Sequence, residues 1–425
     1  MKLKRLDLSS LCRAGLSKEN IDSGDMSLVV LKNLKTDGAA LRSCPLESII
    51  KIDPCTPLTL GLSNYYLKAD GFYRDNILLK AHTFIAPVKI INLIKFIIVQ
   101  DNTRTFFIDK SGIYTANPSG NEIPMANSLA TIPGTGQIVA GGTHFSALNL
   151  DKGYIRWSDI NSDNFDLTKQ NTAGIYNPNI GEVMSVQPLQ DSYIVLGTRG
   201  ACQMYFASHT FGFRDLDIPL INPNKTCATS STNLVLYIDQ DNNLVQIDKN
   251  GSFLILGYSW IAKDTVDLKY LNGRNQFVLT TALQSYHLDS KGMFSYGYKT
   301  FGEFNKELAV STDFEQTTWE FRTNFYNLDR AGFKTLEEIY IRDGLSNSTV
   351  IGYCETLEKT FGYKTLNNFE ACKYRIVGNK IAIGYKATIA PTISDFALEF
   401  MKIDKRFGSG KLPYNGGKNV SETSA

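Results

Sequence analysis

The stretch VQIDKNG, residues 245–251, reads as the end of one β-strand followed by a turn. Its apolar residues Val245 and Ile247 flank a polar one, which is the alternation of a half-buried strand. Asp and Gly suit the turn because they tolerate backbone dihedrals that other residues resist. Four other stretches have the same order: YYLKADG (65–71), FFIDKSG (106–112), LNLDKG (148–153) and YHLDSKG (286–292). This recurrence indicates an internal repeat, and the repeat decides the fold.

The period of the repeat follows from the last apolar residue before each turn. Residues 67, 108, 150, 247 and 288 are separated by gaps of 41, 42, 97 and 41. The long gap contains a further copy, YIVLGTRGACQMYF (193–206), and Tyr205 divides that gap into 55 and 42. The preceding strands give a second set at gaps of 41, 56, 40 and 43, formed by Ile98, Val139, Val195, Val235 and Val278. A period near 41 residues with several short strands per unit predicts β-propeller blades.

The pattern changes along the chain, and the changes divide it into segments. We expect an all-β protein with a β-propeller of about six blades and an appended antiparallel β-sandwich. Longer alternating strands such as NKIAIGYKATI (379–389) indicate the sandwich. The expected segments are an N-terminal extension or closing strand (1–45), the propeller (46–315), the sandwich (316–404) and a flexible tail rich in Gly, Ser and Asn (405–425).

One repeat interval is longer than the others by about fifteen residues, and the surplus falls on RWSDINSDNFDLTKQNTAG (156–174). We interpret this polar stretch as a loop inserted at one edge of the propeller, between the third and fourth repeat units. Such a loop offers a docking surface to neighbouring proteins. The candidate contact residues are Arg156, Trp157, Asp159, Asn161, Asp163 and Phe165.

The same loop begins like a calcium-binding loop, with Asp159, Asn161 and Asp163 at alternate positions. Its sixth and twelfth residues are Asn164 and Gln170, whereas a calcium loop has Gly and a bidentate Glu there. A solvated polar loop that caps its own turns is the favoured reading, and calcium binding stays open. A similar pattern at Asp239, Asp241 and Asn243 is better explained by a tight hairpin turn. We therefore expect no metal and no cofactor.

Catalytic motifs are missing from the sequence. It has no G-x-S-x-G motif, and the glycines of GTGQIVAGG (134–142) precede a strand instead of following one. The four histidines have no partner at metal-ligand spacing, so structural hydrogen bonding is expected for them. Repeated aspartates occupy equivalent turns, which favours a structural role: Asp70, Asp109, Asp151, Asp248 and Asp289. We expect that the protein is not an enzyme.

Composition restricts the possible partners. The 425 residues include 44 basic and 42 acidic side chains, for a net charge of +2, so no bulk positive surface for nucleic acid is indicated. Seven cysteines without a C-x-x-C pair are typical of free thiols in a reducing compartment. The sequence shows neither a signal peptide nor an apolar run long enough for a membrane span. We expect a soluble, non-secreted protein without membrane contact.

The order of segments resembles that of the tail nozzle or hub proteins of short-tailed phages, the group that includes packaged-DNA stabilisation proteins. None of the individual motifs is specific by itself. The segments that carry the resemblance are Asn33-Leu34 with DGAALRSCP (37–45), GQIVAGG (136–142) followed by IRWSDI (155–160), GEVMSVQPLQDSYIVLGTRG (181–200), KTLEEIYI (334–341) and DFALEFMKI (395–403).

The resemblance implies a structural virion protein of the tail, assembled in the host cytoplasm. It implies a cyclic ring of identical copies, expected to be a hexamer, beneath the head-to-tail connector. Such a ring extends the DNA channel, helps to retain and eject the genome, and contacts connector or adaptor proteins and tail fibres. Packaged DNA would pass through without specific binding, which a near-neutral net charge suits.

Two other functions remain open at this point. The first is a carbohydrate-binding or glycan-cleaving propeller, in which Trp157 and Tyr154 would stack on sugars. The second is a cytosolic propeller scaffold for protein–protein contacts, which would have the same fold but no association with a virus particle.

Overall fold

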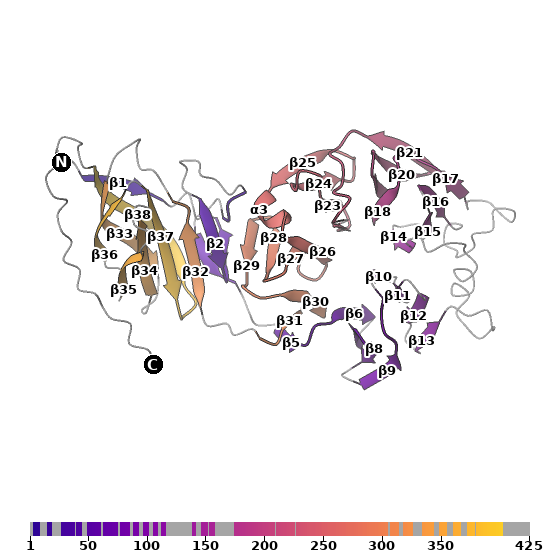
Figure 1. The fold of residues 1–425 in the computed structure, drawn as a ribbon, viewed down its shortest axis with the longest axis horizontal. Helices are drawn as coiled ribbons and strands as arrows, with labels where there is room; N and C mark the ends of the chain where they lie inside the picture. Colours follow the sequence, from indigo (N-terminus) through magenta and orange to yellow (C-terminus); the bar gives the residue numbers. More distant parts are fainter. Residues whose placement is uncertain are drawn as a thin grey trace.

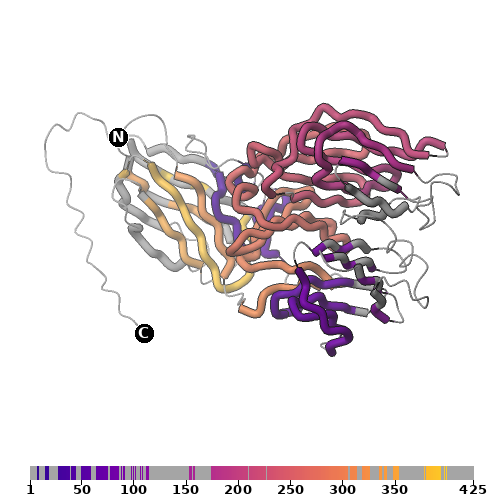
Figure 2. Tube along the Cα trace, turned by 45° about the vertical axis from the view of Figure 1, so that its right-hand side comes forward, coloured from indigo at the N-terminus to yellow at the C-terminus, as the bar shows by residue number. Residues whose placement is uncertain are grey.

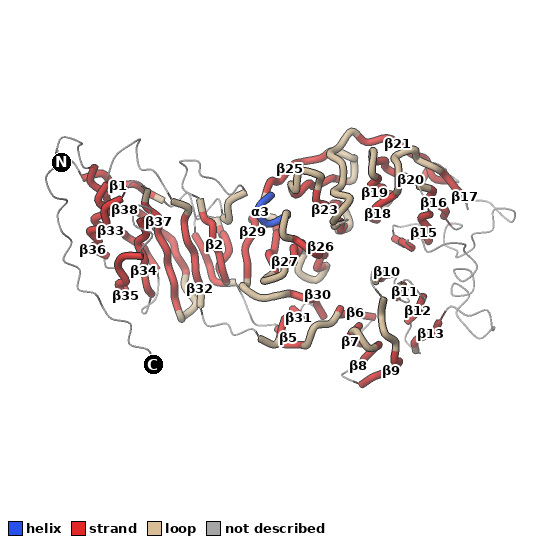
Figure 3. The backbone as a smooth tube through the Cα atoms, viewed as in Figure 1, coloured by secondary structure: helices blue, strands red, loops and turns tan. Residues whose placement is uncertain are grey.

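The computed structural model consists almost entirely of β-strands (Figure 1). Its single described helix is the four-residue α3 (Ser259–Ala262), drawn in blue in Figure 3. The structure describes residues 3–8, 15–18, 27–38, 40–44, 49–60, 63–74, 77–85, 88–92, 97–101, 105–108, 112–115, 138–141, 146–151, 153–157, 174–208, 210–225, 227–304, 307–313, 318–325, 334–343, 348–354, 360–366, 372–378 and 380–402.

Five separate four-stranded sheets, each built from consecutive antiparallel strands, form most of a ring. The first two blades are β6 (Thr56–Leu60), β7 (Ser63–Lys68), β8 (Gly71–Arg74) and β9 (Ile77–Ala81), then β10 (Lys89–Asn92), β11 (Ile97–Gln100), β12 (Thr105–Ile108) and β13 (Ile113–Thr115). The third is β14 (Ile138–Gly141), β15 (Ser146–Asp151), β16 (Tyr154–Trp157) and β17 (Gly174–Tyr176). The fourth and fifth are β18 (Val183–Pro188), β19 (Ser192–Gly197), β20 (Ala201–Ala207) and β21 (Thr210–Leu216), then β22 (Ala228–Ser230), β23 (Leu234–Ile238), β24 (Leu244–Asp248) and β25 (Phe253–Gly257).

Two further sheets complete the ring. The strands β26 (Thr265–Leu271), β27 (Gln276–Thr281), β28 (Ser285–Asp289) and β29 (Gly292–Ser295) form a blade inside a larger sheet. The last sheet has three described strands, β30 (Thr300–Phe304), β31 (Glu307–Ser311) and the early strand β5 (Ile49–Ile52), which lies parallel to β31. The innermost strand β30 packs against β6, so the end of the propeller segment meets its beginning. The protein is a β-propeller. Its described ring consists of five separate four-stranded blades and these two further sheets, which differs slightly from the expected six blades.

The appended sandwich lies beside the propeller and uses strands from both ends of the chain (Figure 2). One sheet contains β1 (Leu3–Asp7), β3 (Leu34–Asp37), β4 (Ala40–Ser43), β33 (Lys334–Asp343), β36 (Cys372–Gly378) and β38 (Thr392–Lys402). The other contains β2 (Leu28–Lys32), β32 (Trp319–Thr323), β34 (Ser348–Cys354), β35 (Thr360–Leu366) and β37 (Ile381–Ala387). The segment before residue 45 therefore supplies four sandwich strands, whereas the tail 405–425 lies outside the described residues.

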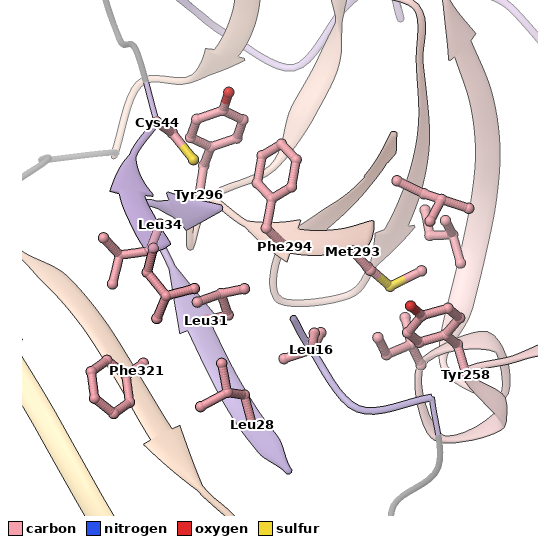
Figure 4. Close-up of a cluster of buried hydrophobic side chains, with 14 of the residues drawn as sticks. Leu16, Leu28, Leu31, Leu34, Cys44, Tyr258, Met293, Phe294, Tyr296 and Phe321 are labelled. Atoms are coloured by element: carbon pink, nitrogen blue, oxygen red, sulfur yellow. The ribbon is translucent and has the colours of Figure 1, made fainter. Parts of the chain in front are cut away.

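Propeller and sandwich share one nine-stranded sheet, in the order β26-β27-β28-β29-β2-β32-β37-β34-β35. The junction is a parallel pairing that places Lys32 of β2 opposite Ser295 of β29. One core of buried side chains crosses the junction, with Phe294 on the propeller side, Leu31 on β2 and Phe321 on β32 (Figure 4). Because sheet and core are both continuous, the two parts form one packed body.

A short segment at residues 15–18 strengthens this junction. Leu16 is buried and forms a parallel bridge with Leu28 of β2. On the other side, the carbonyl oxygen of Lys18 accepts a hydrogen bond from the backbone N–H of Tyr258, 2.5 Å, just before α3. The indole N–H of Trp260 donates to the carbonyl oxygen of Ser17, 3.2 Å. The segment thus ties β2 to the connection between the fifth and sixth blades.

The repeat predicted from the sequence is out of step at two blades. In the first set of anchors, Leu67 and Leu150 lie on second strands, whereas the others lie on third strands. The anchors Ile98, Val195, Val235 and Val278 lie on the second strands of their blades, but Val139 lies on β14, a first strand. Successive antiparallel hairpins of a blade have similar patterns, so a shift by one strand preserves the apparent period. As a consequence the inserted stretch lies between β16 and β17, inside the third blade, and the expected position between the third and fourth units is wrong.

Candidate functional site

The predicted docking loop connects the third and fourth strands of the third blade. Residues 158–173 lie outside the described residues, so Asp159, Asn161, Asp163 and Phe165 are not placed. Arg156 lies within β16, opposite Asn149 of β15 and Ile175 of β17. The docking role of this loop, and its calcium alternative, therefore remain predictions.

Trp157 has a different role from the one expected. Its side chain is 5% exposed, and its ring packs against Phe211 and Phe213 of the fourth blade at centroid distances of 5.7 and 5.8 Å. The ring also occupies the space that a Cβ atom would need at Gly174, on the neighbouring strand. The expectation that Trp157 contacts a partner or a sugar is corrected here, because burial between two blades leaves the ring no free face. It anchors the base of the loop.

A pocket of about 370 Å³ lies at the junction of the third and fourth blades. Its lining comes from the β15–β16 turn, the connection from β17 to β18 and the β19–β20 turn. In a four-stranded antiparallel blade, these second-to-third turns and blade-to-blade connections share one face of the ring. The end of β16 and the start of β17, which flank the inserted stretch, lie at the opposite face. The pocket residues are Gly153, Asn177, Asn179, Gly181, Glu182 and Arg199.

The backbone around this pocket is held by close contacts. A Cβ atom at Gly153 would lie 2.9 Å from the carbonyl oxygen of Gly181, and the φ angles of these two residues are +87° and +82°. Thr198 binds Glu182 twice: its N–H donates to the Glu182 carbonyl oxygen, 3.0 Å, and its hydroxyl accepts from the Glu182 N–H, 3.1 Å. Glycine is required here because the turns approach closely in a left-handed conformation.

The chemistry of the pocket is that of a binding surface. Glu182 and Arg199 contribute opposite charges, and Asn177 and Asn179 contribute amide donors and acceptors. The pocket lining includes neither a nucleophile nor a histidine. Tyr154, which is 47% exposed, directly follows Gly153, so an aromatic ring lies next to this polar set in the sequence. Such a combination can hydrogen-bond and stack on a polar ligand.

The two described histidines are structural, as expected. His82 bonds to the Asp101 carboxylate, 2.7 Å, and packs edge-on against Phe84 and Phe106. The bond joins the segment after β9 to the residue that follows β11. His287 is fully buried, and its nitrogens bond to Gln276 and Thr300 at 3.3 and 3.0 Å. Burial, aided by the positive charge of Arg274, lowers the pKa of His287 to about 3.

The repeated aspartates were expected to have a structural role in their turns. Two of them have described side-chain hydrogen bonds that confirm this role. Asp248 accepts hydrogen bonds from the N–H groups of Asn250 and Ser252, at 2.8 and 3.0 Å. Asp289 accepts one from Lys291, 2.8 Å. These carboxylates stabilise their own hairpins.

The second calcium-like pattern is also a turn, as expected. The Asp239 carboxylate accepts a hydrogen bond from the N–H of Asn243, 2.6 Å, and Asn242 has a φ of +60°. In the described part of the chain, no group of three or more His, Cys, Asp or Glu side chains is placed to hold a metal ion. Four cysteines there are free and buried: Cys44, Cys55, Cys202 and Cys227.

A second candidate surface was not anticipated. The outermost strands β9 and β25 each begin with three consecutive exposed apolar side chains, at residues 77–79 and 253–255. The sequences ILLK and FLIL lack alternation, and such short apolar runs are usually read as buried strands. Only their position as the fourth strand of a blade reveals that they lie at an outer edge.

Comparison with known proteins gives neither a family model nor a curated protein that matches the chain. Similar solved structures include PorZ, a surface component of the type-IX secretion system of Porphyromonas gingivalis, with 9% identity and a TM-score of 0.38. That match covers 65% of this chain and 36% of PorZ, so the chain spans about a third of its length.

Two WD40 domains are similar over more of their length. The fission yeast SCAP domain has 10% identity and a TM-score of 0.31, over 80% of this chain and 97% of that domain. The Neurospora crassa Pan2 domain has 9% identity and a TM-score of 0.36, over 79% and 90%. Such distant likenesses carry no argument about function. No helix in the described ranges is long and apolar enough to cross a membrane.

Proposed function

We propose that the protein is a structural component of a phage tail, forming a nozzle, hub or adaptor ring below the connector. In this role it extends the DNA channel and helps to retain and eject the genome, and it has no enzymatic activity. Its partners are further copies of itself in a cyclic ring, taken as a hexamer, together with connector or adaptor proteins and tail fibres.

The observation that carries the proposal is the sheet shared by propeller and sandwich. A component stacked beneath a pressurised head has to keep its parts in fixed orientation. The parallel pairing of Lys32 with Ser295 and the common core across it favour such a rigid body. The order of segments, which resembles that of tail nozzle and hub proteins, supports the same role.

The charge balance also supports it. A net charge of +2 on 425 residues gives DNA no strong bulk attraction, so a duplex can slide past.

Quantitative mass spectrometry of purified particles tests the proposal. Virus-sized particles are separated on a density gradient, and the amount of this chain is compared with that of the capsid protein. We expect the chain in the particle band at a few to about a dozen copies per particle, as a cyclic ring requires. Detection in the soluble fraction alone would contradict a role in the tail.

Glycan binding is the second candidate, and the pocket beside the exposed Tyr154 favours it. Its test is a glycan array probed with the full chain and with the variants Tyr154→Ala and Glu182→Gln. Loss of a signal in both variants would support it. Tyr205→Ala, at a tyrosine that is exposed on the fourth blade, is the matched control.

A further inference from the structure

Two blades of the ring have an outermost strand that begins with three consecutive exposed apolar side chains. The side chains of residues 77–79 on β9 and residues 253–255 on β25 are between 40% and 67% exposed. Successive side chains of a strand point to opposite faces, so three consecutive exposed residues mean that both faces are open. Within the described residues, β9 pairs with β8 alone and β25 with β24 alone, which leaves one backbone edge of each strand open as well.

The composition of these two edges is unusual for a surface. Strand β25, FLILG, carries no charge, and β9, ILLKA, carries Lys80 alone. Exposed edge strands are normally protected by charged residues or proline, because a bare edge pairs with other strands. The equivalent strand β21 follows that rule, with Arg214 and Asp215 exposed on it. The two apolar edges therefore favour a covered state in the assembled protein.

The chain itself shows how such an edge is covered. On the sixth blade, β2 adds to the outer strand β29 in parallel, and Met293, Phe294 and Ser295 of β29 are buried there. The early strand β5 adds to β31 in the same parallel sense. Parallel strand addition is thus used twice within this one molecule.

We infer that β9 of one copy of this chain adds to β25 of a second copy. The two edges have equal length, five residues each, and similar apolar chemistry. They belong to the first and fifth blades and lie on opposite sides of the ring (Figure 1). Two unlike edges on opposite sides fit a head-to-tail contact, in which each copy gives one edge and receives the other. A single foreign partner would account for one edge and leave the other bare.

The direction of pairing follows from the blade topology. Both strands are the fourth of an antiparallel blade, so they run the same way along the propeller axis. Copies that turn the same face upward therefore meet in parallel, as β2 meets β29. A five-residue strand is about 17 Å long, too short to bury the roughly 800 Å² per partner of a standard interface. A single junction is consequently weak, and closure into a ring, which rests on the proposed function, gives each copy two.

Three lysine variants of the full chain test the contact by sedimentation velocity up to high micromolar concentration. Leu78→Lys changes β9 and Leu254→Lys changes β25, at side chains 47% and 56% exposed, so the fold is kept. Leu283→Lys is the matched control, at an apolar residue 87% exposed in the β27–β28 turn. We expect the unchanged chain and the control to associate, and each edge variant to remain monomeric with an unchanged melting temperature.

Mixing the two edge variants is the most specific measurement. The Leu78→Lys copy keeps an intact β25 and the Leu254→Lys copy keeps an intact β9, so the mixture can form one junction and should stop at dimers. A monomeric unchanged chain, an edge variant that associates like the control, or blockage by one variant alone would overturn the inference. Particle-bound chain with no effect of the edge variants would remove this contact and leave the tail function standing. Rings that depend on the two edges but do not associate with particles would support this contact and contradict the tail function.

Discussion

The side-chain amide of Asn33 donates a hydrogen bond to the carbonyl oxygen of Thr318, 2.7 Å, on the sandwich side of the junction with the propeller. The Asn33 N–H donates to Ser295 of the sixth blade, 2.7 Å, and its carbonyl oxygen accepts from Cys44, 2.8 Å. The residue is fully buried and has a φ of +57°, a conformation that asparagine tolerates better than most residues. The backbone and side chain of this one residue thus connect three segments.

Replacing Asn33 by alanine should destabilise the protein. The variant loses the amide bond and leaves the Thr318 carbonyl without that donor, which costs about 1–3 kcal/mol in the free energy of unfolding. Denaturant unfolding of the full chain measures the loss. Asn33→Gly, which adopts the positive φ freely, separates the lost hydrogen bond from backbone strain. Equal stability of Asn33→Ala and the unchanged chain would contradict this reading of the junction.

Trp157→Ala should weaken the contact between the third and fourth blades. The substitution removes a buried ring that packs on Phe211 and Phe213, and such changes cost about 3–5 kcal/mol. Thermal unfolding followed by near-ultraviolet circular dichroism would report it. Tyr154→Ala, at the other end of the same strand and exposed, should change the melting temperature little. A similar small effect at both positions would argue against the anchoring role.

Lys225 should matter through its three hydrogen bonds. Its ammonium group donates to the carbonyl oxygens of Ala262, 2.8 Å, Thr265, 3.1 Å, and Lys263 at the end of α3. Lys225→Met keeps the length of the side chain but leaves these acceptors without the charge, so we expect a loss of about 1–3 kcal/mol. Chemical denaturation of Lys225→Met is compared with Lys249→Met, at an exposed lysine. A loss no larger than that of the control would refute a stabilising role for these three hydrogen bonds.

His287 should make the protein sensitive to mild acid. Burial lowers its pKa from 6.5 to about 3, so the unfolded chain takes up a proton in this pH range and the folded protein does not. Stability is therefore complete above pH 6.5 and falls as the pH drops below it, by up to roughly 1.4 kcal/mol per pH unit. Melting temperatures between pH 7 and 5 measure the slope. His287→Gln should flatten it, and an unchanged slope would assign the acid sensitivity to other groups.

The propeller could be predicted from the sequence because its information is local. The stretches at residues 245–251 and 286–292 form hairpins whose Asp accepts hydrogen bonds from its own turn, so the repeat is visible within a few residues. The frame of the third blade could not be fixed, since Val139 on a first strand and Val195 on a second strand have the same apolar surroundings. The buried state of Trp157 depends on Phe211 and Phe213, which lie in the next blade, and no pattern near residue 157 reveals them.

The N-terminal sandwich strands and the exposed apolar edges of β9 and β25 could not be predicted from the sequence for a related reason. Pairing of Leu3 with Met401 joins residues from opposite ends of the chain, and neither neighbourhood encodes its partner. The apolar runs at residues 77–79 and 253–255 have the pattern of interior strands, and their exposure follows from position in the blade alone. The pocket also combines three separate connections of the ring.

The pairing of β1 with β38 has a consequence for how the protein is made. During synthesis the first strands leave the ribosome long before their partners β29, β32 and β38 exist, and β5 likewise waits for β31. The nascent chain thus carries apolar strands such as LVVLK at residues 28–32 without a place to pair. Long-range pairing of this kind is slow and exposes aggregation-prone edges. Efficient production should therefore depend on chaperones that hold the early strands until translation is almost complete.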